Sequence, residues 1–341
     1  MIVIGEEGLP DRTDRELVVS ELASRYAATA GFVNLYFQHN DTGERSKSSA
    51  DEWLASFSEL QRFYVDYALS SNTRAAQVFR AFGDAVGHSR GRHLDIGCGY
   101  GGTLHAFASG GYDCVGVEIN PTLAEYSRAN TAEFGTTILN QSFIDLDVSG
   151  WGKFDAITCN EVIEHVSDAT AVINKLVSLL RPGGTVMMEI PNKDFIEFVG
   201  KDGHFQLFGI TLLSREESRR LKELLTGQAD DFAHMGEAYP LDFYENSLKR
   251  MGLGVFRRDT HVVPTDKITI ANLISALMSR YAEYTRRELP ILTDHLVHKA
   301  FGAYCRELFS EYERVITASD WTTFQERYLT SFWTIYGRAP E

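Results

Sequence analysis

Cysteine is scarce and scattered in this chain. The cysteines, Cys98, Cys114, Cys159 and Cys305, include no C-x-x-C pair, so the sequence has no paired-cysteine motif for metal binding or redox chemistry. The first three fall in predicted core strands or in a glycine-rich loop. We therefore expect buried, free thiols.

Long apolar runs and an excess of basic residues are also missing. No apolar run approaches the ~18 residues of a membrane span, and the N-terminus carries no signal-peptide pattern, so we expect a soluble cytoplasmic protein with no membrane partner. The 33 lysines and arginines face 47 acidic residues, which gives a net charge of −14. Because neutralisation of phosphates dominates the affinity for nucleic acid, this balance disfavours nucleic acid as a partner.

The chain contains enough apolar sequence for a packed fold. Its 341 residues are 44% hydrophobic and 12% aromatic, which fits one large globular domain or two modest ones. The most informative stretch begins with the apolar run His93–Ile96, which is followed by glycines Gly97, Gly99 and Gly101. A helix-like stretch (103–109) comes next, and then a second apolar run, Cys114–Val117, which ends at Glu118. A strand, a tight loop, a helix and a second strand in this order predict the first half of a parallel α/β nucleotide site.

Two kinds of ligand compete for this loop. Gly97 and Gly99 permit positive φ angles and lack Cβ, so a ligand can approach the backbone closely. A dinucleotide site holds a pyrophosphate at a helix N-terminus, but Asp95 precedes the first glycine and would repel it. An acid there suits an amino-acid ammonium group, and Glu118 can accept hydrogen bonds from both hydroxyls of a ribose. A dinucleotide site and a glycine-rich turn without a ligand remain the alternatives.

The segment Leu94–Gly101 resembles the first motif of the class I S-adenosylmethionine (SAM) methyltransferases. The sequence LLRPGG at 179–184, followed by an apolar strand, is also typical of that class, and the resemblance covers about residues 90–260. It implies that Asp95 lies near the methionine moiety and that Glu118 holds the ribose. The other cofactor-binding residues that it implies are Gly97, Cys98, Gly99, Gly101, Ile119, Ser142, Phe143 and Asn160.

We predict an α/β fold with a Rossmann-like, seven-stranded, mostly parallel sheet and helical N-terminal and C-terminal extensions. The expected domains are an N-terminal helical cap (1–90), a SAM-binding core (91–264) with an inserted lid at about 193–233, and a C-terminal helical region (265–341) that the core does not need. The periodicity and capping patterns also predict helices at 14–30, 53–64, 72–86, 214–226 and 321–336, and a final hairpin from 254–259 and 261–263.

Clustered acids follow the fourth predicted strand, at the edge where open α/β sheets build their sites. Glu161 and Glu164 are three residues apart, so a helical turn would place both carboxylates on one face with His165 beside them. Such a cluster shifts its own pKa values unless a cation neutralises it. Carboxylates combined with one or two imidazoles suit Mg²⁺, Mn²⁺ or Fe²⁺.

This E-x-x-E-H pattern resembles two metal-dependent groups of O-methyltransferases, one acting on catechols in ubiquinone biosynthesis and one on the terminal ribose of small RNAs. The resemblance implies that Glu161, Glu164 and His165 are metal ligands and that a second histidine completes the site. His234, shortly before a predicted helix at 241–251, is favoured over His204 for that role. Many metal-free methyltransferases also carry a Glu-His pair here, which lines the substrate pocket or bonds a backbone group. His165 would then be either the general base or a structural residue behind the pocket.

We therefore expect a SAM-dependent O-methyltransferase, assisted by Mg²⁺ or another divalent cation, with Glu161, Glu164 and His165 as catalytic residues. Its expected substrate is a vicinal diol on a sugar, a glycoside or a similar small polyhydroxylated metabolite, with a catechol-type phenol next. The alternatives are a metal-free natural-product methyltransferase, a small-RNA ribose methyltransferase and a catalytically silent SAM-binding protein. The C-terminal helices would either pack over the active site or form a homodimer interface.

Overall fold

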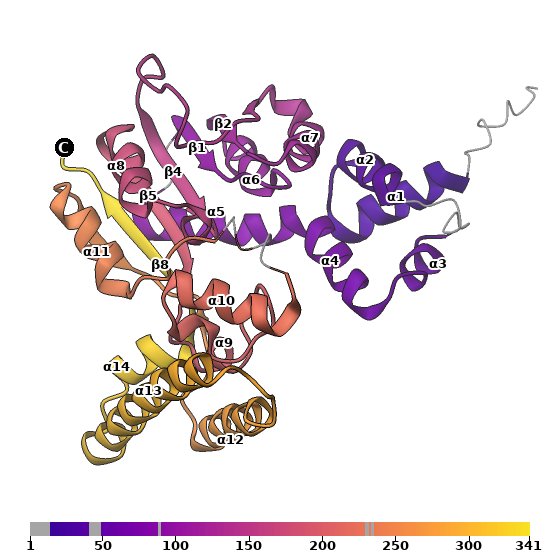
Figure 1. Cartoon of the computed structure of the whole chain (residues 1–341). Coiled ribbons are helices and arrows are strands. Elements are labelled where there is room, and N and C mark those ends of the chain that lie inside the picture. Colours follow the sequence, from indigo (N-terminus) through magenta and orange to yellow (C-terminus); the bar gives the residue numbers. More distant parts are fainter. Residues whose placement is uncertain (1–13, 41–48, 88–89, 229–231, 233–234) are drawn as a thin grey trace, which may run out of the picture. The chain divides into compact units, whose positions relative to one another are not determined.

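The computed structural model describes residues 14–40, 49–87, 90–228, 232 and 235–341. The chain divides into two compact units, the first formed by residues 1–150 with 154–156 and the second by residues 151–153 with 157–341 (Figure 1). In the described part of the chain, no helix is long and apolar enough to cross a membrane.

The first unit joins a helical N-terminal part to a set of parallel strands. Its strand order is β3 (Thr137–Leu139), β2 (Asp113–Val117), β1 (Arg92–Ile96) and the start of β4 (Phe154–Asn160). Its helices are α1 (Asp14–Tyr26), α2 (Ala30–Asn40), α3 (Ala50–Ala55), α4 (Glu59–Leu69), α5 (Ser71–Val86), α6 (Gly102–Ser109), α7 (Pro121–Asn130) and the 3-10 helix η1 (Ala132–Phe134). The predicted strand–loop–helix–strand order of residues 93–118 is confirmed.

The N-terminal helices are shorter and more numerous than the sequence predicts. The helix expected at 14–30 ends at Tyr26, and α2 begins four residues later. The helix expected around residues 53–64 is two helices, because Ser58 and Gln61 form a capping box that starts α4 anew. Ser49 caps α3 as predicted, since its side chain accepts a hydrogen bond from the N–H of Glu52.

These helices share one buried core with α7 and are joined to the glycine loop by a buried asparagine. Residues of α1 to α4, among them the fully buried Trp53, pack together with Tyr126 of α7. The side-chain amide of Asn130 donates to Asn72 Oδ1 (2.7 Å) and to the carbonyl of Tyr100 (2.9 Å). Asn130 thereby ties α5 and α7 to the backbone of the glycine loop.

One buried histidine makes the first unit sensitive to acid. The ring of His93 in β1 is fully buried and stacks on Phe107 with ring centroids 3.8 Å apart, and this burial lowers its pKa to about 3. An unfolded histidine has a pKa of about 6.5, so below that pH the unfolded chain binds a proton that the folded chain excludes. Stability is therefore lost as the pH falls through 6.5.

We expect wild-type protein to lose about 2 kcal/mol of unfolding free energy between pH 7.5 and 5.0 through His93 alone. The variant His93→Leu removes this contribution, so its urea midpoint changes less over the same interval. Equal pH dependence in wild type and His93→Leu would contradict the assignment.

The second unit contains the antiparallel strands and the C-terminal helices. Its strand order is the remainder of β4, β5 (Leu180–Pro191), β8 (Thr330–Arg338) and β6 (Gly254–Arg257), with β7 (His261–Val262) also on β8. Its helices are η2 (Ile163–His165), α8 (Ala169–Ser178), α9 (Ile196–Gly200), η3 (Ile210–Leu212), α10 (Arg215–Thr226), α11 (Leu241–Arg250), α12 (Lys267–Tyr284), α13 (Ile291–Ala318), α14 (Thr322–Phe324) and the π-helical turn η5 (Gln325–Leu329).

The predicted helix at 321–336 is helical only from Thr322 to Leu329 and is wrong beyond that, and the predicted final hairpin is wrong. Residues 330–338 form the strand β8, which pairs antiparallel with β5 from Thr185 opposite Arg338 to Pro191 opposite Phe332. Strands β6 and β7 both pair with β8 and not with each other. The end of the chain therefore contributes a strand to the core sheet, contrary to the expectation that the core does not need it.

The sheet is mixed because β8 is reversed in it, and the described residues supply eight strands where seven were predicted. β1, β2 and β3 are parallel, whereas β8 runs antiparallel to its neighbours β5, β6 and β7. The α/β class and the helical extensions agree with the prediction. The exact division into a cap at 1–90, a core at 91–264 and a helical region at 265–341 stays a prediction.

The predicted lid segment, 193–233, belongs to the core of the second unit where it is described. Buried side chains of α9 and of the loop after it, Val199 and Phe208 among them, pack with Leu277 of α12 and Phe301 of α13. Ser214 and Glu217 form the predicted capping box that opens α10. Closure of this segment over a ligand stays a prediction.

Candidate functional site

The glycine loop between β1 and α6 takes the tight shape that its sequence predicts. Gly97, Gly99 and Gly101 all have positive φ angles, of 69°, 52° and 79°. The N–H groups of Gly97 and Cys98 both donate to the carbonyl of Val117, at 2.8 and 3.1 Å, and that of Gly101 donates to Cys98. These three N–H groups already have partners within the protein, so they are not free to bind a ligand. What the glycines offer is that a ligand can come close to the backbone.

Gly99 is the loop residue with open space beside it. A Cβ built there would have no neighbour closer than 3.9 Å, whereas one at Gly101 would lie 2.7 Å from the hydroxyl of Ser127. The two glycines are therefore needed for different reasons. Gly101 allows α6 to pack on α7, and Gly99 leaves room where a ligand would lie.

Glu118, at the end of β2, is fixed against this loop. Its Oε2 accepts a hydrogen bond from the N–H of Gly99 (2.9 Å), and its Oε1 accepts one from the N–H of Asn120 (2.8 Å). The residue is only 6% exposed. Each carboxylate oxygen has two lone pairs, so the second of each remains for the two hydroxyls of a ribose.

The other predicted cofactor residues of the first unit differ in how far they are buried. Asp95 is buried in β1 opposite Gly116. Cys98 is buried beside Ser127, and this burial raises the pKa of its thiol. Ile119 is 68% exposed and Phe143 is buried. The assignment of these residues and of Ser142 to a cofactor stays a prediction.

In the second unit, the predicted acids follow β4 in an unusual turn. Glu161 has a φ angle of 54°, a left-handed conformation that costs a non-glycine residue about 1 kcal/mol or more. Its N–H donates to the carbonyl of Glu189 (2.8 Å), and Asn160 Oδ1 accepts from the N–H of Glu189 (3.2 Å). These contacts with β5 hold the turn, and η2 then carries Glu164 and His165.

Glu164 is a buried acid with an orphaned carboxylate oxygen. Among the described residues, its Oε2 atom has no hydrogen-bond partner. Burial, with a smaller contribution from the nearby charges of Glu161 and Glu189, raises the pKa of Glu164 to about 8. An orphaned carboxylate oxygen of this kind needs a proton or a cation.

Two imidazoles complete a small group around this carboxylate. The rings of His165 and His204 lie 5.0 Å apart, and His165 Nε2 lies 4.0 Å from Glu164 Oε1. One ligand atom from each of Glu164, His165 and His204 lies within 4.8 Å of the other two. In the described residues this group is suited to hold a metal ion.

His204 is brought to this group by a turn that the sequence analysis did not use. The carboxylate of Asp202 accepts hydrogen bonds from the N–H groups of His204 (2.9 Å), Phe205 (2.8 Å) and Leu207 (2.6 Å). An aspartate that begins an Asp-Gly-His sequence signals such a turn. Partial removal of the His204 ring from water lowers its pKa, which favours the neutral imidazole that binds metals.

The predicted ligands Glu161 and His234 are not in this group of three. Glu161 is exposed, and its role as a ligand stays a prediction. His234 lies outside the described residues. The N–H of Gly236 donates to the carbonyl of Glu164 (2.6 Å), and a Cβ on Gly236 would lie 2.3 Å from the carbonyl oxygen of Val166. The segment from Gly236 therefore runs directly along the turn that carries Glu164.

Comparison with known families gives one match that covers more than half of the chain. A family model described as "Methyltransferase domain" matches residues 67–257. This range includes the glycine loop, Glu118 and the group formed by Glu164, His165 and His204.

Curated relatives and solved structures give further similarities. A ubiquinone biosynthesis O-methyltransferase from Xanthomonas axonopodis pv. citri is 38% identical over 104 residues, which is 30% of this chain and 44% of the relative. That from Xanthomonas euvesicatoria pv. vesicatoria is 36% identical, with the same coverage. The chain thus spans less than half the length of these relatives. A structure of Haemonchus contortus phosphoethanolamine N-methyltransferase 2 in complex with S-adenosyl-L-methionine has a TM-score of 0.43 and 14% identity, covering 78% of this chain and 53% of that one.

Proposed function

This chain belongs to the methyltransferase-domain family, and from that premise we propose that it is a SAM-dependent O-methyltransferase. The observation that carries the proposal is the pairing of the open loop position Gly99 with Glu118, whose carboxylate is fixed by the N–H of Gly99. A loop without Cβ next to a fixed acid suits a nucleoside that presents two ribose hydroxyls. The similarity to O-methyltransferases supports oxygen as the methyl acceptor.

We further propose that a divalent cation binds in the second unit. The residues fit such an ion, because in the described part of the chain Glu164 Oε2 is buried with no hydrogen-bond partner and two imidazoles lie close enough to share a metal with it. Glu164, His165 and His204 would hold the cation, and Glu161 and His234 are the further predicted ligands. A mixed oxygen and nitrogen ligand set suits Mg²⁺, Mn²⁺ or Fe²⁺.

Different residues would act on the cofactor and on the methyl acceptor. Glu118 would orient the ribose, and Asp95 would stabilise the ammonium group of the methionine moiety. A bound cation would supply Lewis-acid chemistry, lowering the pKa of a hydroxyl that it contacts. Without a cation, His165 would accept the proton of the acceptor hydroxyl as general base. In both cases the methyl group moves in line from sulfur to oxygen.

The substrate that we propose is a vicinal diol. Two adjacent hydroxyls match a site built from one carboxylate and two imidazoles around a cation. A sugar or glycoside diol agrees with the acidic chain, and the relatives named for ubiquinone biosynthesis support a phenolic diol as a second candidate.

The proposed function is tested by methyl transfer from radiolabelled SAM to a panel of sugar diols and catechols, with and without chelator. We expect activity on at least one diol and at least a tenfold loss after chelation. Mn²⁺ binding, measured by electron paramagnetic resonance, separates the two candidate histidines: His204→Ala is expected to weaken it about tenfold or more.

Each result has a clear consequence for the proposal. Full activity in chelator would show that the metal is not needed and would leave His165 as the base. Weaker Mn²⁺ binding in His234→Ala with none lost in His204→Ala would reverse the choice of histidine. Transfer to amines but to no hydroxyl would contradict the proposed acceptor.

A further inference from the structure

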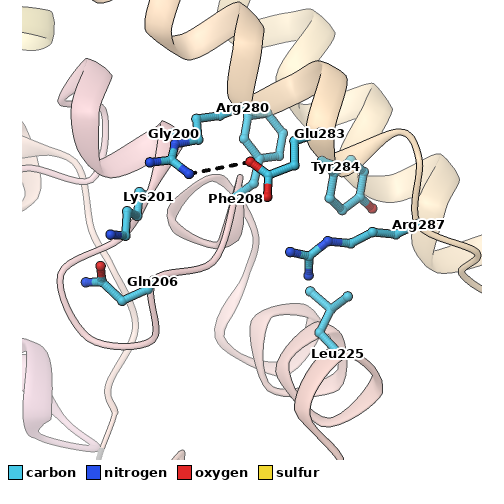
Figure 2. Close-up of a pocket in the computed structure, with 9 residues that line it drawn as sticks. All are labelled: Gly200, Lys201, Gln206, Phe208, Leu225, Arg280, Glu283, Tyr284 and Arg287. Carbon is cyan, nitrogen blue, oxygen red and sulfur yellow. Dashed lines mark hydrogen bonds and ion pairs between the residues drawn. The ribbon is translucent and has the colours of Figure 1, made fainter.

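A surface hollow in the second unit gathers positive charge from two segments that are far apart in the sequence. It is lined by Gly200, Lys201, Gln206, Phe208, Leu225, Arg280, Glu283, Tyr284 and Arg287 (Figure 2). Lys201 and Gln206 come from the loop after α9, and Arg280 and Arg287 come from the end of α12 and the turn that follows it. Figure 2 shows both arginine side chains extending from the α12 side toward the loop.

The charge balance of the hollow is opposite to that of the chain. Three cations and one acid line it, although the whole protein has a net charge of −14. The acid, Glu283, pairs with Arg280 at 3.5 Å. In the described residues, neither Lys201 nor Arg287 lies within ion-pair distance of an acid. Two cations therefore face the same space with no counter-ion among the residues that the structure describes.

The rest of the lining suits a small anion more than a buried apolar group. The side-chain amide of Gln206 donates to the carbonyl of Asp202 (2.9 Å), which fixes this residue at the rim. The rings of Phe208 and Tyr284 lie 5.3 Å apart, tilted by 32°, and both residues are buried.

Gly200 keeps the hollow open. It has no positive φ angle, and a Cβ there would meet only Leu277 and Arg280, each at an ordinary 3.7 Å. Neither the backbone nor the packing therefore requires a glycine. The missing side chain leaves room beside Lys201.

We propose that this hollow binds a small molecule through an oxyanion group, a phosphate or a carboxylate. The guanidinium of Arg287 offers paired N–H donors that match two oxygens of such a group, and Lys201 adds a point charge from the opposite side. The site is separate from the residues of the proposed methyl transfer. Its loop continues into the Asp202 turn that presents His204.

The proposal is tested by isothermal titration of the full-length protein with inorganic pyrophosphate and, separately, with succinate. We expect one of the two to bind, with affinity reduced about tenfold in Arg287→Gln and in Lys201→Gln. The matched control is Arg286→Gln, which removes the same charge from the neighbouring exposed residue outside the hollow. It is expected to leave the affinity within twofold of wild type.

The outcomes distinguish a phosphate site, a carboxylate site and a non-specific effect of overall charge. Binding of pyrophosphate that is lost in Arg287→Gln assigns the site to phosphates, and the same result with succinate assigns it to carboxylates. Equal weakening in Arg286→Gln and Arg287→Gln would show an effect of overall charge and overturn the proposal. Failure of both probes to bind the wild-type protein would also overturn it.

Discussion

Alanine at Gly99 is expected to weaken SAM binding at least 100-fold, about 3 kcal/mol, while the protein stays folded. The added Cβ would enter the open space beside Glu118, where the account places the cofactor. The N–H of residue 99 remains to hold Glu118, so the loop itself loses only the cost of a left-handed alanine, about 1 kcal/mol. Calorimetric titration with SAM measures the affinity, and a urea midpoint measures the stability.

Gly135 provides a matched control in the same unit. It too has a positive φ angle, 65°, and no atom within 4 Å of a built Cβ. Gly135→Ala therefore carries the same backbone cost as Gly99→Ala but changes nothing at the loop. Similar SAM affinities for the two variants would mean that the cofactor does not lie at Gly99.

Trp333→Ala is expected to lower the free energy of unfolding by about 3–5 kcal/mol. Trp333 is only 2% exposed in the middle of β8, and its indole N–H donates to the carbonyl of Glu326 (3.1 Å). Its removal leaves a cavity in the core of the second unit and takes away one hydrogen bond to the carbonyl of Glu326. The loss is measured by urea unfolding followed by circular dichroism.

Trp321→Ala is the control, because Trp321 is only partly buried and lies before the strand. Its loss is expected to cost at most about half as much. Were residues 321–336 a surface helix, as their sequence suggests, the two tryptophans would contribute similarly. Equal losses of unfolding free energy in the two variants would therefore contradict the assignment of residues 330–338 to a buried strand.

The glycine loop was predictable because its chemistry is local. Gly97, Gly99 and Gly101 permit the positive φ angles that this tight turn uses, and Glu118 follows its strand directly in sequence. The capping box of Ser214 and Glu217 and the α/β class follow from equally short patterns. Such features can be predicted because they depend on residues that are close together in the sequence.

The final strand was not predictable from local patterns. Residues 321–336 place apolar side chains at spacings that fit a helix, but β8 is held by partners far away in the chain. The buried amide of Asn192 donates to the carbonyls of Arg327 (2.9 Å) and Thr330 (2.7 Å), just before the strand begins. Antiparallel pairing with β5 then outweighs the helical pattern.

The same limit applies to the candidate metal group. Glu164 and His165 adjoin in sequence and were identified together, but the histidine that joins them depends on a turn set by Asp202. The family resemblance favoured His234, whereas His204 is the histidine that the described structure brings to Glu164. Only the tertiary arrangement distinguishes two histidines that are both downstream of β5.

The most direct test of the central claim is calorimetric titration of the full-length wild-type protein with SAM. The account predicts one saturable site per chain that Glu118→Ala weakens at least tenfold, because the ribose then loses a charged hydrogen-bond acceptor. A protein that is folded by circular dichroism and yet binds no SAM would contradict the account.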